Sequence, residues 1–428
     1  MSKYRHMQEA WGIEGNPFPS EAIHQGNEPY SPGVFADEQE LFFSRLIYGA
    51  AMDRRGFGYL WSKGPSGEDT GFGKTTLLKN AAKMINADFG SAVLISAGMR
   101  EDRLSKHPAL AAYASLTTTD VTGIYPILFA AVEYLADPKY SPSGIAVLDT
   151  LRGKIRDANG LAAGDAEGLR TVLQATRRNL GATLPPLRAD ALDAFCDGSD
   201  SDFAAFLGEV SPASRVRNGL AYFDFAFSLA AAAGIKHFFV LVDQLEDLAT
   251  NQTVTKAKRS REVGRLRDVI AEMVPFVGRV HFVFTFHIRA SDALIDFWVQ
   301  NRLPSFDPED HSNEGSVVVL RGIQETSQVR DLLMTYLDEL REDGPTGTIA
   351  PFTESVLPLL LERSGGRPGL LLSFAHKLFD RAADQEIPQI DRLFVQSLLG
   401  LDAATTFTNR RRESVEPRDA RAVDDLLT

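Results

Sequence analysis

The chain has 428 residues, of which 44% are hydrophobic, enough for two or three domains with a large core. Its formal net charge of -12 argues against a general attraction to nucleic acid or to anionic membranes, so contact with DNA would need a local basic patch. The single cysteine, Cys196, excludes an intramolecular disulfide and a site with several cysteine ligands. Residues 1–6 lack the apolar segment of a signal peptide, and no apolar run is long enough to span a bilayer, so we expect a cytoplasmic protein outside the membrane.

The first segment, residues 1–36, is rich in Gly, Pro and Asn and predicts an extended arm without regular structure. Its aromatic residues would anchor the arm across a neighbouring surface. Asp37 is then a candidate N-cap, and apolar residues recur at helical spacing from Leu41 to Ile47. This pattern predicts an amphipathic helix that leads into the first strand.

A glycine-rich loop at residues 67–76 lies between the apolar run 57–61, which predicts a strand, and a helix that ends near Ile85. Such a loop turns backbone N–H groups toward an anion at the positive end of the following helix. Lys74 would reach the terminal phosphates of a nucleotide, and the Thr75 hydroxyl would coordinate Mg2+. The candidate nucleotide-binding residues of the loop are Gly67, Gly71, Phe72, Gly73, Lys74, Thr75 and Thr76.

The spacing of this loop departs from the usual pattern of two glycines separated by four residues, because Glu68 stands at the first glycine position. Either the loop is longer by one residue, or Gly71 takes over the tight turn. In both cases Glu68 and Asp69 must point away from bound phosphates.

The segment that follows predicts a second strand at 91–96 and then a helical insertion at about 97–219. The insertion carries no catalytic pattern, and a role in specificity and a purely structural role both remain open. Gly, Pro and Asp interrupt it, and its helices are expected near 125–135, 144–156, 168–180 and 189–207.

A helix at 216–233 precedes the continuous apolar run 237–242, which is typical of a strand buried on both faces of a parallel sheet. Asp243 ends this strand, where ligands bind in open α/β sheets, and is a candidate to support Mg2+. Glu246 or Asp247 could orient the attacking water.

The next apolar run, 280–287, contains Thr285, which could hydrogen-bond the terminal phosphate or the water. A last strand at 316–320 completes a five-stranded parallel sheet. The predicted fold class is therefore α/β.

The C-terminal part predicts a helical lid at about 324–402, with helices at 325–340, 353–363 and 370–383. Arg367 lies between a Gly-Gly turn and Pro368, at the start of the third helix. From this junction it could contact a bound nucleotide. Residues 403–428 are polar and predict a flexible tail.

In this order of elements the sequence resembles an AAA+ type P-loop ATPase over about residues 37–400, through the phosphate loop, the Asp243 strand, the Thr285 strand and the lid with Gly-Gly-Arg367-Pro. Within that group, the run 242–248 is similar to the signal-transducing STAND-type ATPases and the related origin-recognition clade. Asn16-Pro17-Phe18 also resembles a motif of DNA-transposition regulator ATPases.

This resemblance implies ATP and Mg2+ as cofactors and assigns a role to each candidate residue. It also implies a homo-oligomer, because such ATPases complete their sites with an arginine from a neighbouring subunit. The roles would be phosphate and Mg2+ binding for Lys74 and Thr75, metal support for Asp243, general base for Glu246, sensor 1 for Thr285, sensor 2 for Arg367, and the arginine of the neighbouring subunit for Arg289 or Arg302.

Gln244 occupies the position at which most members of this family carry the catalytic glutamate. A glutamine can orient a water molecule through its amide but cannot accept its proton. The expected ATPase activity is therefore slow, as suits a switch.

Two purposes remain open. The first is a regulator in DNA transactions such as replication, transposition or defence against mobile elements. The second is a nucleotide-locked scaffold or signalling switch that assembles an unidentified protein partner without DNA. The basic run 255–262, with Arg265 and Arg267, could touch DNA phosphates or form a solvated helix face.

Overall fold

The computed structural model describes residues 3–20, 31–63, 70–116, 122–184, 187, 189–197, 200–245, 248, 254–286, 288–310, 315–342 and 346–398. The chain forms two compact units. The helical unit is made of Met1–Ala36, Ser62–Thr76 and Leu320–Thr428, and the sheet unit of Asp37–Trp61 and Leu77–Val319. No helix among the described residues is both long and apolar enough to cross a membrane.

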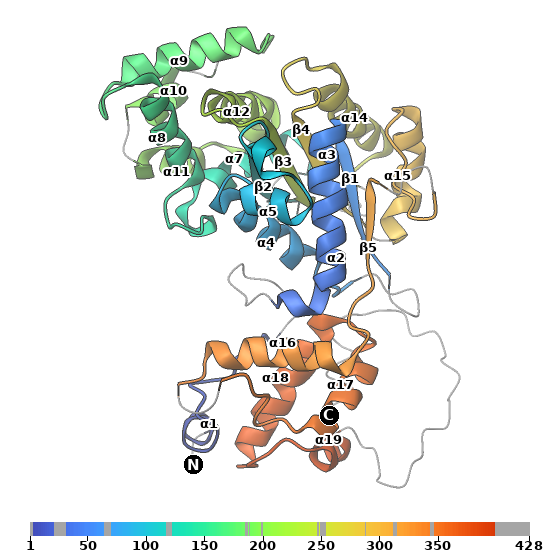
Figure 1. The fold of residues 1–428 in the computed structure, drawn as a ribbon. Coiled ribbons are helices and arrows are strands. Elements are labelled where there is room, and N and C mark those ends of the chain that lie inside the picture. The colour runs from blue at the N-terminus through green and yellow to red at the C-terminus, as the bar shows by residue number, and fades with distance from the viewer. Residues whose placement is uncertain are drawn as a thin grey trace. The chain divides into compact units, whose positions relative to one another are not determined.

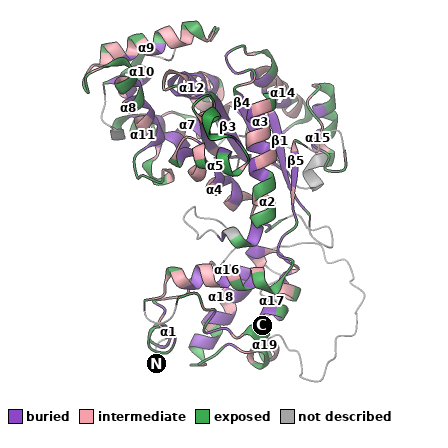
Figure 2. Cartoon of the chain, in the orientation of Figure 1, coloured by how far each residue is buried: buried purple, intermediate pink, exposed green. Residues whose placement is uncertain are grey.

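The sheet unit is built on five parallel strands in the order β2-β3-β4-β1-β5 (Figure 1). Nearly all strand residues are buried, as expected for a parallel sheet covered on both faces (Figure 2). The predicted α/β fold class is therefore confirmed. The strands are β1 Phe57–Ser62, β2 Ala109–Ser115, β3 His237–Asp243, β4 Val280–Thr285 and β5 Val317–Leu320.

The prediction of the second strand was wrong. Residues 91–96 form the short helix α5 (Ser91–Ser96), where Asp88 accepts a hydrogen bond from the Ala92 N–H at 2.8 Å. The strand is instead the alanine-rich β2, which lies at one edge of the sheet. The Asn86 side chain donates to the Ala111 carbonyl and accepts from its N–H, at 2.8 and 2.9 Å. This amide therefore pairs backbone groups on the open edge of β2.

The expected insertion is helical but also contains β2, so its first helix precedes β2 in the chain and its other helices lie between β2 and β3. The last helix expected there is in fact two helices, of which the first ends at Cys196 and the second begins at Asp200. The helices of this part are α6 Glu101–Leu104, α7 Ile124–Ala136, α8 Val147–Asn159, α9 Ala166–Asn179, α10 Ala189–Cys196, α11 Asp200–Gly208 and α12 Pro212–Ala232.

The remaining helices around the sheet precede β1, lie between β1 and β2, or follow β3. The helix expected from Asp37 is present, but its second half is a π-helix at Phe42–Tyr48 between α2 (Ala36–Leu41) and α3 (Gly49–Asp53). After β3 come α14 (Lys256–Arg267), a π-helical turn at Asp268–Glu272 and α15 (Ile288–Gln300). The loop helix is α4 (Lys74–Ala87).

The helical unit joins the N-terminal segment to the C-terminal helices in one hydrophobic core. Contrary to the prediction of an arm without regular structure, Lys3–Trp11 forms the helix α1. The glycines and prolines of the arm begin only at Gly12, so this stretch has no helix breaker. The C-terminal helices are α16 Thr326–Glu339, α17 Leu357–Ser364, α18 Pro368–Asp384 and α19 Arg392–Leu398, with a 3-10 turn at Glu354–Val356.

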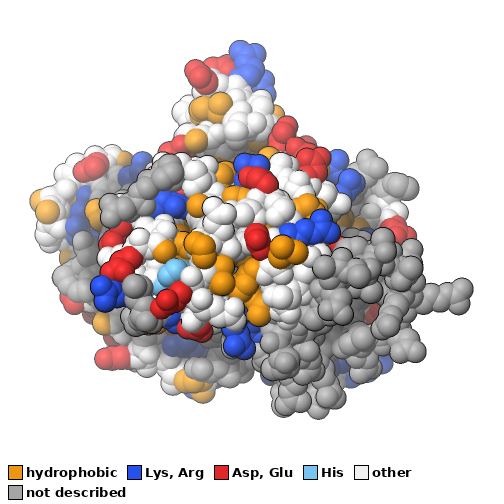
Figure 3. Space-filling view, turned by 90° about the horizontal axis from the view of Figure 1, so that it is seen from below, with side chains coloured by type: hydrophobic (Ala, Val, Ile, Leu, Met, Phe, Trp, Pro, Cys, Tyr) orange, Lys and Arg blue, Asp and Glu red, His pale blue; other side chains and the backbone are white. Residues whose placement is uncertain are grey.

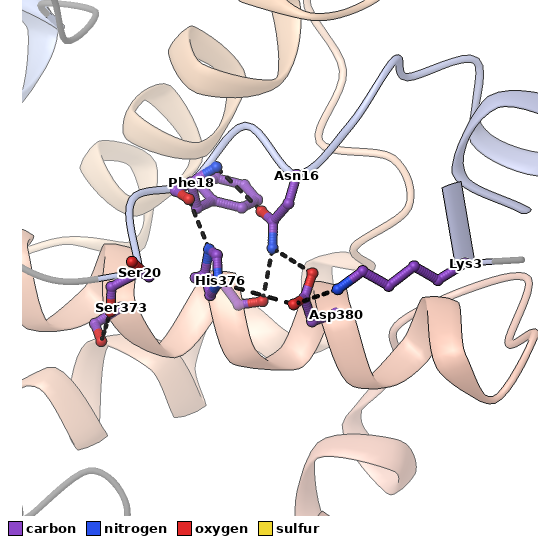
Figure 4. Close-up of polar contacts among 7 residues, drawn as sticks. All are labelled: Lys3, Asn16, Phe18, Ser20, Ser373, His376 and Asp380. Atoms are coloured by element: carbon purple, nitrogen blue, oxygen red, sulfur yellow. Dashed lines mark hydrogen bonds and ion pairs between the residues drawn. The ribbon is translucent and has the colours of Figure 1, made fainter. Parts of the chain in front are cut away.

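The arm after α1 is held to α18 by its Asn-Pro-Phe motif (Figure 4). The Asn16 side chain donates to the His376 carbonyl at 3.0 Å and to the Asp380 carboxylate at 2.8 Å. The ring of Phe18, only 3% exposed, packs edge-on against Phe352 and Phe379. The prediction that aromatic residues anchor the arm is therefore confirmed within this unit.

Three histidines form a hydrogen-bonded row near the amino-terminal ends of β2, β3 and β4. The Arg55 carbonyl can only accept, so His281 Nδ1 donates to it at 2.7 Å. His281 Nε2 then accepts from His237 Nδ1 at 3.1 Å, and His237 Nε2 from His107 Nδ1 at 3.0 Å. Burial, with the neighbouring histidines, lowers the pKa of His237 to about 3. Burial also lowers the pKa of His281 to about 4.

Candidate functional site

The carboxyl ends of β3 and β4 bring the two predicted polar residues Asp243 and Thr285 together. The Thr285 hydroxyl donates to Asp243 Oδ1 at 2.8 Å, and both side chains are buried. Thr285 lies opposite Leu60 in the register of β4 with β1, two residues before β1 ends. From β1 the chain goes on to β2, at one edge of the sheet, and from β4 it goes on to β5, at the other edge. The direction of the connections therefore reverses between the neighbouring strands β1 and β4. Ligands bind at such a reversal in open α/β sheets.

Gln244 continues this cluster in a left-handed backbone conformation with φ 59°. Its N–H donates to Thr285 Oγ1 at 2.9 Å and to Asp243 Oδ1 at 3.1 Å. Its side-chain oxygen accepts from the Ser115 hydroxyl at 2.8 Å. The amide side chain is thus held toward β2 by its oxygen.

Tyr113 of β2 completes the cluster and was missed by the sequence reasoning. Its hydroxyl donates to Asp243 Oδ2 at 3.1 Å. Burial, followed by the charge of Asp243, raises the pKa of Tyr113 well above its ordinary value, so the phenol keeps its proton. The Lys79 ammonium of α4 lies 5.5 Å from the centre of the ring. Ser115 lies opposite Asp243 in the sheet, and every second residue of a strand points to the same face. Had β2 been located from the sequence, this alternation would have indicated Tyr113 as a neighbour of Asp243.

The glycine-rich loop has the backbone that its sequence requires. Gly71 and Gly73 have φ values of 77° and 81°, which a residue with a side chain adopts only under strain. A Cβ atom on Gly73 would also lie 3.0 Å from the Phe35 ring. Phe72 is buried, with its ring against Gly322. Both glycines are therefore needed for the loop to fold this way.

Lys74 and Thr75, predicted as the end of the loop, are the first two residues of α4. The Lys74 ammonium donates to the Ser62 hydroxyl at 2.7 Å. Ser62 is the last residue of β1 and is fully buried. The contact therefore joins the two ends of the loop within the helical unit.

Arg367 is the N-cap of α18, and its backbone and guanidinium both donate to the Ser364 carbonyl. Two residues later, the Gly369 N–H donates to the Gly71 carbonyl at 3.0 Å. Within the helical unit the structure thus joins the start of α18 to the glycine-rich loop. Thr76 lies in the first turn of α4.

The structure does not place five of the predicted residues in the candidate site. Gly67 and Glu246, like Asp247, lie outside the described residues. Arg289 lies in α15, where its side chain is not described, and Arg302 follows the same helix as an exposed residue with φ 55°.

The basic segment forms α14, in which three arginines pair with acidic residues. Glu262, only 1% exposed, pairs with Arg265 at 2.8 Å and Arg261 at 3.5 Å and accepts from the Ile124 N–H of α7. Arg267 pairs with Glu272 at 2.7 Å. Figure 3 shows another face of the molecule, seen from below the view of Figure 1, on which the visible Lys and Arg side chains are interspersed with Asp and Glu.

Among the comparisons with known proteins, the one with solved structures finds matches. No protein-family model matches the chain, and no curated protein matches it. Among solved structures, it is similar to the Aeropyrum pernix ORC2 protein, solved in ADPNP-ADP complexes. The identity is 10%, the match covers 90% of this chain and 72% of that one, and the TM-score is 0.42.

Proposed function

We propose that this chain is an AAA+ type P-loop switch that binds ATP with Mg2+ and hydrolyses it slowly. The observation that carries the proposal is the Asp243–Thr285–Gln244 cluster at the point of strand reversal, beside the strand that leads into the loop. An acid fixed there is suited to hold the hydration shell of Mg2+.

The residues of the loop fit a phosphate group. Two glycines with positive φ precede a helix whose first residue is a lysine, and the positive end of a helix dipole attracts anions. We assign phosphate binding to Lys74 and Thr76 and coordination of the ion to Thr75, with Asp243 supporting that ion. Mg2+ would neutralise charge on the terminal phosphates. Arg367, at the start of α18, would sense the terminal phosphate.

A second candidate is a nucleotide-locked scaffold that assembles a protein partner, and Gln244 favours it. The glutamine oxygen accepts from Ser115, and an amide cannot take a proton from water. For both candidate functions, any ATP hydrolysis would depend on how the attacking water is oriented, because Gln244 cannot act as a base.

DNA contact and homo-oligomer formation extend the proposal. Lys256 and Lys258 of α14 are the best probes of DNA contact, because Arg259 already donates to the Leu248 carbonyl and Arg261 pairs with Glu262. If they touch phosphates, changing both to glutamine should weaken duplex binding and lower its salt dependence. Changing the exposed Lys106 and Lys236 instead is the matched control.

The first experiment is ATP binding and phosphate release by the unaltered chain, Lys74→Ala and Lys83→Ala, with and without duplex DNA. Lys83 lies on the same helix and serves as the control for loss of one charge. Binding and turnover that are lost only in Lys74→Ala would support the ATPase, and stimulation by DNA would support the DNA purpose. Tight binding without turnover would favour the scaffold. No binding by the unaltered chain would refute the proposed function.

A further inference from the structure

Tyr113 lies where it can set the orientation of the acid at the end of β3. Asp243 and Ser115 are opposite each other in the register of β3 with β2, and Tyr113 comes two residues earlier on the same face of β2. From there its hydroxyl reaches Asp243 Oδ2 at 3.1 Å. Oδ1 instead accepts from Thr285 and from the Gln244 N–H. The Tyr113 hydroxyl therefore contacts the carboxylate oxygen that Thr285 and the Gln244 N–H do not contact.

The tyrosine can act only as a donor in this contact. The carboxylate accepts hydrogen bonds, and burial together with its charge disfavours ionisation of the phenol. Lys79, with its ammonium 5.5 Å from the ring centre, holds the ring from α4. A carboxylate with donors on both oxygens has a fixed plane, so its lone pairs point in fixed directions.

We propose that Tyr113 is a positioning residue that orients Asp243 for the hydration shell of Mg2+, an inference that rests on the proposed ATP-binding function. Groups that hydrogen-bond a metal-supporting residue fix its orientation, and their loss typically weakens metal affinity by about 10- to 100-fold. Tyr113 touches neither nucleotide nor water in this role. Its effect is on the Mg2+ dependence of nucleotide binding and not on nucleotide binding in the absence of the ion.

The test is the Tyr113→Phe variant, which removes one oxygen and keeps the buried ring. Equilibrium binding of a fluorescent ATP analogue is measured by anisotropy, first in EDTA and then at increasing Mg2+. We expect unchanged binding in EDTA, which also shows that the variant is folded, and a Mg2+ midpoint raised by about 10-fold or more.

Tyr134→Phe is the matched control. The Tyr134 ring centre lies 6.1 Å from that of Tyr113, and its buried hydroxyl has no hydrogen-bond partner among the described residues. This variant should keep the original Mg2+ midpoint. An unchanged midpoint in Tyr113→Phe, or an equal shift in both variants, would overturn the role of Tyr113 alone. Failure of the unaltered chain to bind the analogue at any Mg2+ concentration would overturn the proposed function as well.

Discussion

Acidification from pH 7.5 to pH 5.0 should destabilise the sheet unit through its row of histidines. His237 and His281 have folded pKa values of about 3 and 4, against an ordinary value of 6.5. The unfolded chain therefore binds more protons than the folded chain, and the stability present above pH 6.5 is lost progressively as the pH falls toward 4 and 3.

The size of the loss follows from the shifted values. At pH 5.0 both histidines stay neutral in the folded chain, while in the unfolded chain they are almost fully protonated. One pKa unit corresponds to about 1.4 kcal/mol, so each histidine lowers the free energy of unfolding by about 2 kcal/mol, and the pair by about 4 kcal/mol.

Urea unfolding at pH 7.5 and pH 5.0 measures this loss, and His237→Gln is the informative variant. A glutamine amide offers one donor and one acceptor to His281 and His107, but it does not titrate. Carboxylates contribute equally to both proteins, so the difference in pH-dependent loss should be about 2 kcal/mol. An equal loss in both proteins, or NMR titration of His237 near pH 6.5, would refute the reasoning.

Two further predictions concern the arm and the candidate site. Phe18→Ala removes a ring that is 3% exposed and should destabilise the helical unit by about 3–5 kcal/mol, with Phe18→Leu costing less; a change below about 1 kcal/mol in urea unfolding would show that the arm is not anchored by this ring. Gln244→Glu introduces a carboxylate that can accept a proton, so phosphate release should rise while Gln244→Ala shows no rise; unchanged turnover in Gln244→Glu would exclude this position as that of the missing base.

The sequence predicted those parts of the sheet whose apolar runs are long and end in a polar residue. Asp243 and Thr285 could be placed together because each follows or ends an apolar run, and the carboxyl ends of parallel strands lie at the same side of the sheet. The loop was predicted from the combination of its glycines with Lys74 and Thr75 before a helix, which is typical of a phosphate-binding loop.

The parts that were missed have physical reasons. A run of six residues such as 91–96 fits a buried strand and a buried helix equally well, and tertiary contacts decided for the helix. The alanines of β2 led to its prediction as part of a helical region, because alanine is common in helices. In the structure these small side chains are buried in the sheet. Tyr113 was missed together with its strand, and its partner Asp243 lies 130 positions away in the chain.

The packing of the N-terminal arm against α18 has a consequence for synthesis on the ribosome. Asn16 and His376 are 360 positions apart in the chain. At roughly 5–20 residues per second, the arm waits about 20 to 70 s after its own synthesis before the helix that it binds has been made. During that time Trp11 and Phe18, which end buried, lack their native partners on α18. The aromatic side chains of the arm therefore reach their native contacts only late in translation.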